Sequence, residues 1–450
     1  MKRDMSKSLR LFLFLLFVAA FFISAPVVVL YTAGYRFDLT HGRIVHTAIL
    51  NITSEPRSAN VLIDDETSAN DKTPAVIDTI TPGEHRVTLE TLDYLPWETL
   101  LTFESREARV IGPIILFLDE APTLQETMVA SLTSTHELTN RIAYVTQESS
   151  WLEVWVVEAA DGGKKLLMRL PYIDSSEYSL SWSKNGTYLG LIEQHGSQQD
   201  LAVSRVSDGT AISLPEVTQD IEDSWWDLGH ESYLYVQTGT QINRIDATTG
   251  TQTTLPYTAD RISTYGSSEV SLSLSSNRTV VSYQEGETAS IITYLPLGTY
   301  QFVPAPTGLV ALHEQNRNRL ILLDLGNREQ PILLNEEATL WKWHASGDLL
   351  LYSSGYDLKR YVRSAHETET LTRLSTPIEE LDWYPKGTCA VYRSSGVTVA
   401  LNLDGSNTLS QTTLAQGLEG SFWISPDGLT LSTLFQTQSG WEWWTRALQN

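Results

Sequence analysis

Two hydrophobic patterns divide this chain into an N-terminal apolar segment and a long region of alternating residues. From Leu11 to Tyr35 no residue is charged, and the centre of that segment, Leu11–Leu30, is mostly apolar. Beyond about residue 47, apolar and polar residues alternate in short runs separated by Gly, Pro, Asn and Asp. A long apolar run suits a helix that crosses the roughly 30 Å hydrocarbon layer of a membrane, whereas alternation with a period of two suits β-strands. The pattern therefore predicts one transmembrane helix followed by an all-β region.

The charges beside the apolar segment predict its orientation. The first ten residues contain one acidic residue, Asp4, and four basic ones, Lys2, Arg3, Lys7 and Arg10. Because basic flanks stay in the cytoplasm, we expect a cytoplasmic tail over residues 1–10. A single-pass helix over residues 11–33 would then contact the lipid bilayer of the cell membrane, with the bulk of the chain outside. The alternative is a cleaved signal peptide with Ile-Ser-Ala at 23–25 as its processing site, but the apolar run continues past it, which favours an uncleaved anchor.

Residues 47–118 have the pattern of a small β-module. Pro82-Gly83 supplies a turn, and no stretch between the turns has helical periodicity. Short strands without intervening helices predict a small antiparallel β-sandwich. The strand-like runs are Ile49–Thr53, Ala59–Asp64, His85–Glu90, and the stretches near Glu98–Phe103 and Arg109–Phe117.

This module resembles a PEGA domain. The run Thr53–Asp64, Thr-Ser-Glu-Pro-Arg-Ser-Ala-Asn-Val-Leu-Ile-Asp, is similar to the family pattern Ser-x-Pro-x-Gly-Ala-x-Val-x-Ile-Asp-Gly. Later family positions follow in the same order, at Thr73-Pro74, Ile80, Pro82-Gly83-Glu84-His85 and Tyr94. Ser58, Asp65 and Asp93 stand where the family carries Gly. The resemblance implies a surface-exposed β-module, common in extracytoplasmic bacterial and archaeal proteins, and implies no catalysis.

The remainder of the chain repeats a unit in which an aromatic residue precedes a Gly by four or five positions. A second turn, such as Asp161-Gly162 or Asp404-Gly405, follows an apolar strand later in several units. With a period of about 34–47 residues and about four strands, each unit has the size of a propeller blade. The clearest copies are Trp182–Gly186, Trp225–Gly229, Trp343–Gly347, Trp383–Gly387 and Trp423–Gly428.

Burial explains why such units would close into a ring. One twisted four-stranded sheet leaves both apolar faces open, and stacking the sheets around an axis covers both. We count eight units, beginning near 128, 178, 223, 269, 302, 340, 380 and 420; seven blades with a degenerate connector is the alternative. The prediction is therefore a β-propeller over residues 128–450, joined to the sandwich by a polar linker at 119–127. The recurring Trp side chains are expected to pack between blades.

Two copies of the repeat resemble a known family. Trp182–Gly186 (Trp-Ser-Lys-Asn-Gly) and Trp423–Gly428 (Trp-Ile-Ser-Pro-Asp-Gly) are similar to the Trp-Ser-Pro-Asp-Gly repeat of TolB-like propellers, which are WD40-like. The resemblance implies a binding platform in the cell envelope. It transfers no partner, because the repeat residues belong to the scaffold.

Composition narrows the classes of partner. The chain is 42% hydrophobic and only 19% charged, which fits packed domains rather than disorder. Its formal net charge of -23 argues against a nucleic-acid partner, whose phosphates it would repel. Cys389 is the single cysteine, so no internal disulfide can form. Its alternating surroundings predict a small buried hydrophobe.

The search for chemistry finds no catalytic, cofactor-binding or metal-binding signature, so no such site residue and no cofactor is predicted. Asp64, Asp65, Glu66 and Asp71 have the oxygen density of a calcium site but not the EF-hand spacing, and a solvated turn explains them better. His344, inside a blade, is expected to be packed or at an edge rather than to bind a metal. Three acidic pairs are expected on connections between blades: Glu222-Asp223, Glu336-Glu337 and Glu379-Glu380.

The sequence thus predicts a membrane-anchored extracytoplasmic binding or scaffold protein whose propeller engages an envelope protein or a glycan. The alternatives are a structural cell-surface component and an enzyme with a site in the propeller channel. Fold alone does not assign function, and the pattern identifies neither the partner nor the face that binds it.

Overall fold

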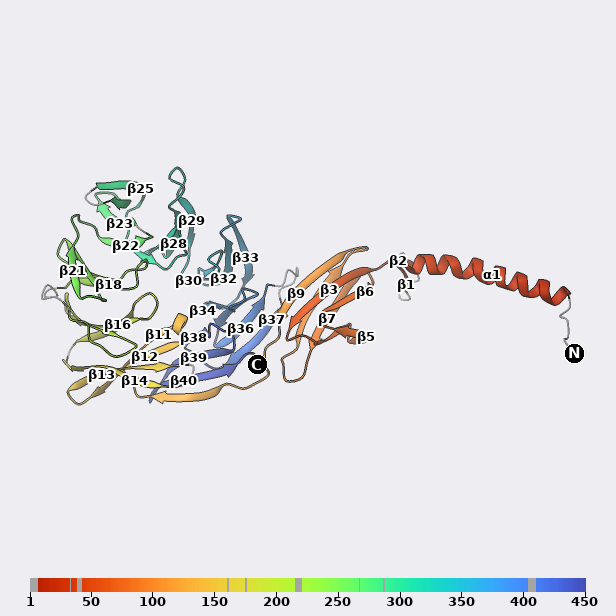
Figure 1. The fold of residues 1–450 in the computed structure, drawn as a ribbon, viewed down its shortest axis with the longest axis horizontal. Helices are drawn as coiled ribbons and strands as arrows, with labels where there is room; N and C mark the ends of the chain where they lie inside the picture. The colour runs from red at the N-terminus through yellow and green to blue at the C-terminus, as the bar shows by residue number, and fades with distance from the viewer. Residues whose placement is uncertain are drawn as a thin grey trace. The chain divides into compact units, whose positions relative to one another are not determined.

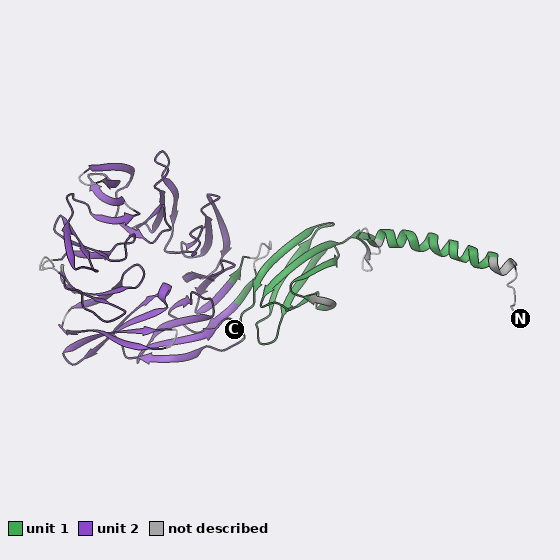
Figure 2. Ribbon diagram, viewed as in Figure 1, with its two compact units in different colours: residues 1–119, 401–412 green, residues 120–400, 413–450 purple. Residues whose placement is uncertain are grey.

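A computed structural model describes residues 7–32, 34–38, 43–159, 162–174, 176–214, 221–266, 268–285, 288–403 and 410–450. Figure 2 shows the two compact units into which the chain divides. One comprises residues 1–119 and 401–412, and the other residues 120–400 and 413–450.

The predicted membrane segment forms a helix. Helix α1 (Lys7–Thr32) contains Pro26, and its segment Leu11–Leu30 has a mean hydropathy of 2.8 with no part buried in the protein. The helix is long and apolar enough to cross a membrane, which agrees with the prediction for residues 11–32. The last predicted position, residue 33, lies outside the described residues. A short hairpin follows, made of β1 (Tyr35–Asp38) and β2 (Arg43–His46).

The next strands build a two-sheet sandwich. Side chains that alternate along each strand fill a shared core, in which Leu50, Val61, Val87 and Trp97 are almost fully buried. One pair, β3 with β9, runs parallel, which differs from the purely antiparallel module that the sequence predicted. One sheet has the order β6 (Ala75–Ile80), β3 (Ala48–Glu55), β9 (Ala108–Ile115), and the other the order β5 (Glu66–Lys72), β4 (Asn60–Ile63), β7 (Gly83–Glu90), β8 (Trp97–Phe103).

Three turns of the sandwich keep a glycine-like backbone without glycine. Ser58, Asp65 and Asp93 have φ angles of 68°, 66° and 65°. These are the positions at which the PEGA pattern carries Gly, so the turn geometry persists although the residue has changed. Left-handed backbone costs a non-glycine residue about 1–2 kcal/mol, less where Asp can bond locally. Ser58 therefore holds a conformation that a glycine would adopt without strain.

Replacing Ser58 by Gly is expected to stabilise the sandwich by about 0.5–1 kcal/mol, since relief of the left-handed strain exceeds the added entropy of the unfolded chain. The measurement is the thermal unfolding midpoint of the full-length protein in detergent. Ser105→Gly is the control, because Ser105 has no positive φ angle and should lose stability on the same change. Equal destabilisation by both substitutions would contradict this account of the turn.

After residue 120 the described chain forms eight successive sheets (Figure 1). The first four, in chain order, are β11 (Leu132–His136), β12 (Arg141–Glu148), β13 (Trp151–Glu158), β14 (Lys164–Pro171); β15 (Glu177–Trp182), β16 (Tyr188–His195), β17 (Gln198–Arg205); β18 (Asp223–Trp226), β19 (Tyr233–Thr238), β20 (Gln241–Asp246), β21 (Thr251–Thr254); and β22 (Arg261–Tyr265), β23 (Ser268–Ser275), β24 (Arg278–Glu285), β25 (Thr288–Pro296).

The remaining sheets continue the same antiparallel meander. They are β26 (Tyr300–Val303), β27 (Leu309–Glu314), β28 (Arg319–Asp324), β29 (Ile332–Glu337); β30 (Leu340–Trp343), β31 (Leu349–Ser353), β32 (Asp357–Val362), β33 (Glu367–Arg373); β34 (Ile378–Trp383), β35 (Cys389–Ser394), β36 (Val397–Asn402), β37 (Gln411–Gln416); and β38 (Ser421–Ile424), β39 (Thr430–Thr437), β40 (Gly440–Ala447) with β10 (Thr123–Met128).

The sheets form a β-propeller, as the sequence predicted. Apolar clusters join the first six sheets in order, and the last sheet packs on the first through residues such as Trp423 and Ile142. First strands of neighbouring sheets lie against one another, for example β11 with β15 and β30 with β34. The first strands therefore line the inside of the ring. The fourth sheet begins at Arg261 rather than near 269, because the sequence pattern matched its second strand, β23.

Strand β10 closes the ring from the other end of the chain. It pairs antiparallel with β40, and the register places Thr123 opposite Thr445 and Met128 opposite Trp441. In Figure 1 this orange strand lies beside the blue strands of the last sheet. The stretch 119–127, expected as a linker, thus contributes most of a strand. The other domain limits, 47–118 and 128–450, stay a prediction.

The recurring Trp side chains pack between sheets, as expected, and several also donate hydrogen bonds there. Trp226 Nε1 donates to the Ser181 carbonyl at 3.1 Å, and Trp383 Nε1 donates to the Lys342 carbonyl at 3.0 Å. Both bonds join the first strands of adjacent sheets. Trp423, which is fully buried, donates to Asn140 Oδ1 across the closing junction.

Replacing Trp383 by Phe is expected to keep most of the packing but to remove the hydrogen bond to the Lys342 carbonyl. One such hydrogen bond contributes about 0.5–1.5 kcal/mol, so the thermal unfolding midpoint should fall. Trp151, which is 42% exposed on β13, provides the control, and Trp151→Phe should leave the midpoint almost unchanged. An unchanged unfolding midpoint in Trp383→Phe would show that packing alone holds the two sheets together.

Candidate functional site

A pocket of about 480 Å³ opens among the connections between the first and second strands of four propeller sheets. We call it the loop pocket. Its volume lies within the range of ordinary ligand sites, about 300–1,000 Å³. It is lined by residues 135–138, Lys184, residues 304–306, residues 341–345 and Gly347.

The walls of the loop pocket are mainly apolar and aromatic. Trp341 and Trp343 come from β30, Pro304 and Pro306 from the connection after β26, and Leu138 from the short helix η1 (Glu137–Thr139). Leu138 is 73% exposed, so it adds apolar surface to the pocket that a ligand could cover. The indole of Trp341 lies 4.6 Å from the imidazole of His313 between ring centres. Flat rings held by their neighbours are suitable surfaces for stacking a ligand.

The charged side chains beside the pocket form an ion-pair network. Lys342 Nζ pairs with Glu137 of η1 and lies 3.7 Å from Asp382 Oδ1 on β34. Asp382 also accepts hydrogen bonds from the backbone N–H groups of Trp383 and Ile424. Burial raises the pKa of Asp382, while Lys342 and these N–H groups act in the opposite direction. The network therefore links four sheets beside the pocket, through Glu137, Lys342, Asp382 and the Ile424 N–H.

Two histidines of the pocket have both ring nitrogens engaged. His136 contacts Thr139 Oγ1 through Nδ1 at 2.8 Å and the Lys184 carbonyl through Nε2 at 3.2 Å. Since a carbonyl can only accept, Nε2 carries the proton. His344 repeats the arrangement with Ser346 Oγ and the Pro385 carbonyl, both at 2.9 Å.

Each of these rings sits on a glycine of the following sheet. A Cβ atom on Gly186 would lie 2.9 Å from His136 Nδ1, and one on Gly387 would lie 3.1 Å from His344 Nε2. Both glycines also have positive φ angles, 70° and 72°. The aromatic-to-Gly spacing of the repeat thus has two causes, the turn itself and the close approach of the neighbouring side chain. His344 is a packed residue, as the sequence predicted.

The state of His136 gives a pH-dependent prediction. Burial lowers the pKa of His136, so the folded protein resists protonation that the unfolded chain accepts below about pH 6.5. Stability should therefore be complete above that pH and fall as the pH decreases further. His136→Gln should reduce the fall of the thermal unfolding midpoint between pH 7 and pH 5. Replacement of the exposed His366 by Gln should leave that fall unchanged. An unchanged slope in His136→Gln would contradict the assignment.

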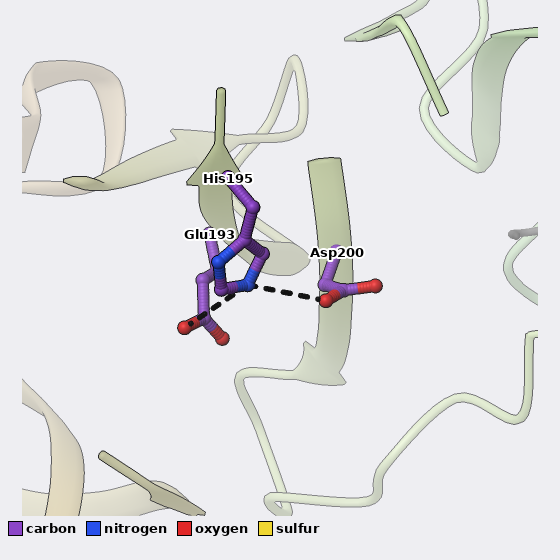
Figure 3. Close-up of side chains that lie close together, drawn as sticks. All are labelled: Glu193, His195 and Asp200. Atoms are coloured by element: carbon purple, nitrogen blue, oxygen red, sulfur yellow. Dashed lines mark ion pairs between the residues drawn. The ribbon is translucent and has the colours of Figure 1, made fainter. Parts of the chain in front are cut away.

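A second group of side chains meets on the β16–β17 hairpin (Figure 3). His195 Nε2 lies 3.3 Å from Glu193 Oε1 and 3.3 Å from Asp200 Oδ2. Glu193 is directly opposite Asp200 in the strand register. One donor atom from each of the three residues falls within 4.8 Å of the others, which would suit a metal ion.

The other residues that the sequence singled out mostly have structural roles. Cys389 is fully buried in β35, as predicted. In the acidic turn, Asp64 accepts a hydrogen bond from the Arg86 backbone N–H at 2.9 Å and contacts His85 Nδ1 at 2.6 Å. These contacts fit a structural turn; the side chain of Asp71 lies outside the described residues.

The expectation that the acidic pairs lie on connections was wrong for Glu379-Glu380 and Glu336-Glu337. Glu379 and Glu380 lie within β34, and both pair with Arg393, at 3.2 and 2.9 Å. Glu380 also accepts the Phe422 N–H of the next sheet at 2.8 Å. A buried arginine and a backbone donor compensate these charges, so strands can carry them. Glu336-Glu337 ends β29 in the same way, with Glu336 paired to Lys359 at 3.4 Å.

Sequence reasoning missed both the loop pocket and the three-residue cluster. The pocket unites residues from sheets far apart in the chain, and no local pattern reports that. The cluster had a weak signal, an acid and a histidine two positions apart followed, after a Gly-Ser turn, by an acid on the returning strand. Such spacing places all three on one face of a hairpin.

Comparison with known proteins identifies one domain. Residues 47–111 match the PEGA domain family, as the sequence resemblance predicted. No curated protein sequence matches the chain. Together with the apolar helix, the PEGA match indicates a membrane or extracellular protein.

The chain is also similar to solved structures. The Dos1 propeller is 15% identical with a TM-score of 0.48, covering 72% of this chain and 94% of its own. Saccharomyces cerevisiae Sqt1 is 13% identical with a TM-score of 0.46, covering 73% and 98%. The oligogalacturonate lyase of Vibrio parahaemolyticus is 10% identical with a TM-score of 0.39, covering 68% and 96%. At these values we draw nothing about function from the likeness.

Proposed function

We propose that this protein is a membrane-anchored, extracytoplasmic binding protein whose propeller captures a segment of a partner protein in the loop pocket. The observation that carries the proposal is that the walls of the pocket are mainly apolar and aromatic, while His136, His344 and Lys342 are already hydrogen-bonded or ion-paired. The partner is expected to be another component of the cell envelope.

The polar groups of the pocket favour a peptide segment over a glycan. Sugar rings need several converging donors and acceptors besides a stacking surface. Here both nitrogens of His136 and His344 are occupied, and Lys342 is paired with Glu137. What remains for a ligand is mainly the apolar surface around Trp341 and Trp343, together with the Trp343 indole N–H, which has no hydrogen-bond partner among the described residues. A short segment with aromatic or aliphatic side chains would bury that surface.

The same contacts argue for binding rather than catalysis. A general acid or base needs a titratable group free to reach the substrate. The imidazoles and the Glu137 carboxylate of the loop pocket serve as links between sheets instead. We therefore propose a recognition role without a catalytic step.

Proposed binding at the loop pocket can be tested with a displayed random-peptide library and full-length protein in nanodiscs. Peptides rich in aromatic or aliphatic residues should be selected, and Trp341→Ala should weaken their binding at least tenfold, about 1.4 kcal/mol. Trp151→Ala, an exposed indole on β13, is the matched control and should have no effect.

Two other outcomes would overturn the peptide proposal. Selected peptides that bind Trp341→Ala as well as the parent would place their site elsewhere. Envelope oligosaccharides that bind in a Trp341-dependent way, with no peptide selected, would assign the pocket to a glycan.

The orientation of the anchor is the other part of the proposal. The four basic residues among the first ten positions support a cytoplasmic N-terminus with the folded units outside. The natural cysteine is buried, so introduced cysteines can report orientation. With a membrane-impermeant maleimide on intact cells, Ser439→Cys in an exposed turn should be labelled, and Ser6→Cys should be labelled only after lysis. The opposite pattern would reverse the topology.

A further inference from the structure

The hairpin of β16 and β17 places three metal-binding side chains around one point (Figure 3). Glu193 and His195 project from the same face of β16, two residues apart, and Asp200 lies opposite Glu193 on β17. Residues that face each other in an antiparallel pair have their Cβ atoms about 4.5–5.5 Å apart, which the paired backbone holds fixed. A rigid hairpin thus presents one imidazole nitrogen and two carboxylates together.

The distances fit a metal better than they fit hydrogen bonds. Charge-assisted N–H···O bonds are about 2.7–2.9 Å long. His195 Nε2 instead lies 3.3 Å from a carboxylate oxygen on each side. Ligands about 2.0–2.1 Å from a tetrahedral Zn²⁺ are separated by about 3.3 Å, the edge of that tetrahedron. His195 Nε2 is therefore spaced from each carboxylate oxygen as two ligands of one small dication would be, and all three atoms lie within 4.8 Å of one another.

Neighbouring groups orient two of the three side chains. His195 Nδ1 contacts Ser176 Oγ at 3.1 Å, which leaves Nε2 turned toward the carboxylates. Metal-binding histidines commonly use their second nitrogen in this way, with the hydrogen bond fixing the ring. Tyr178 donates to Glu193 Oε1 at 2.8 Å. Both supporting residues come from the segment that leads into β15 and from β15 itself, so they belong to the same sheet.

The charge and the solvent exposure of the three side chains also suit a metal ion. The two carboxylates carry two negative charges, which a divalent cation neutralises. Side-chain exposures of 69% for Asp200 and 33% for His195 leave the group open to solvent, so a water molecule can supply a fourth ligand. One imidazole among the donors favours a transition metal over Ca²⁺ or Mg²⁺, which prefer oxygen alone.

We propose that Glu193, His195 and Asp200 form a surface site for a divalent transition-metal ion, with Zn²⁺ the best match. Each residue supplies one donor atom, His195 through Nε2, and water fills the remaining position. The site lies on the outer part of one propeller sheet and does not depend on the ligand of the loop pocket. Ser176 acts as a positioning residue for the imidazole.

The test uses full-length protein in nanodiscs, stripped with EDTA and dialysed, and a Zn²⁺ titration in competition with a chromophoric chelator. One Zn²⁺ per chain should bind, and His195→Gln and Glu193→Gln should each weaken that binding at least tenfold. His366→Gln replaces an exposed histidine elsewhere and is the matched control, which should bind as the parent does. Ser176→Ala should weaken binding about tenfold while all three ligands remain.

A second readout separates the site from nonspecific binding and from misfolding. Co²⁺ in place of Zn²⁺ should give the visible absorption of a tetrahedral ion in the parent and in His366→Gln, and not in Glu193→Gln. Unfolding midpoints in EDTA should be the same for all variants, because the hairpin surface is not part of the core.

Three results would overturn the proposal. Stoichiometric Zn²⁺ binding that survives His195→Gln would place the ion elsewhere. Tighter binding of Ca²⁺ than of Zn²⁺ would exclude an imidazole ligand. Absence of binding up to millimolar Zn²⁺ would leave the cluster as a histidine paired with two carboxylates.

Discussion

The structure depends on covering both apolar faces of each propeller sheet. A sheet of four short strands buries too little surface on its own, and the described sheets pack on their neighbours through apolar clusters or through contacts between their first strands. The ring has to be completed for the first and last sheets to be covered as well. Pairing of β10 with β40 does this by joining residues near the start of the propeller to the end of the chain.

The contacts that hold neighbouring sheets also shape the loop pocket. Trp383 and Asp382 at the end of β34 bond to β30 and β38, and His136 and His344 reach the turns of the next sheets. The loops after the first strands are therefore held close to one another. Once these polar groups are used between sheets, the surface left for a ligand is mainly aromatic and apolar. The same hydrogen bonds thus stabilise the propeller and shape the pocket proposed to bind a partner.

Much of the fold could be predicted because it is encoded locally. The apolar run of α1, the alternation of the sandwich and the spacing from Trp to Gly each lie within a short window. The spacing succeeds because the glycine meets two physical demands at once, as Gly186 does beneath His136. It failed at the fourth sheet, whose first strand, Arg261–Tyr265, has no Trp and no glycine four or five positions after an aromatic residue.

What could not be predicted rests on partners distant in the sequence. Strand β10 is polar at most positions, and only its pairing with β40 makes it a strand. Glu380 looked like a solvated surface acid until Arg393 and the Phe422 N–H were placed beside it. The loop pocket and the Glu193 cluster likewise arise from positions that the fold brings together. A single sequence contains the residues of such sites but does not show which of them become neighbours in the folded protein.

Ring closure can be tested most directly by a disulfide between β10 and β40. Thr123 and Thr445 are opposite each other in the register, and residues so paired have Cα atoms about 4.5–5.5 Å apart, within reach of a disulfide. Mild oxidation of the Thr123→Cys, Thr445→Cys double variant should crosslink these positions in the folded full-length protein. The control, Thr123→Cys with Thr437→Cys, places the second cysteine at the far end of the hairpin and should stay reduced. Failure of the first pair to crosslink, or equal crosslinking of both, would contradict a ring closed by these two strands.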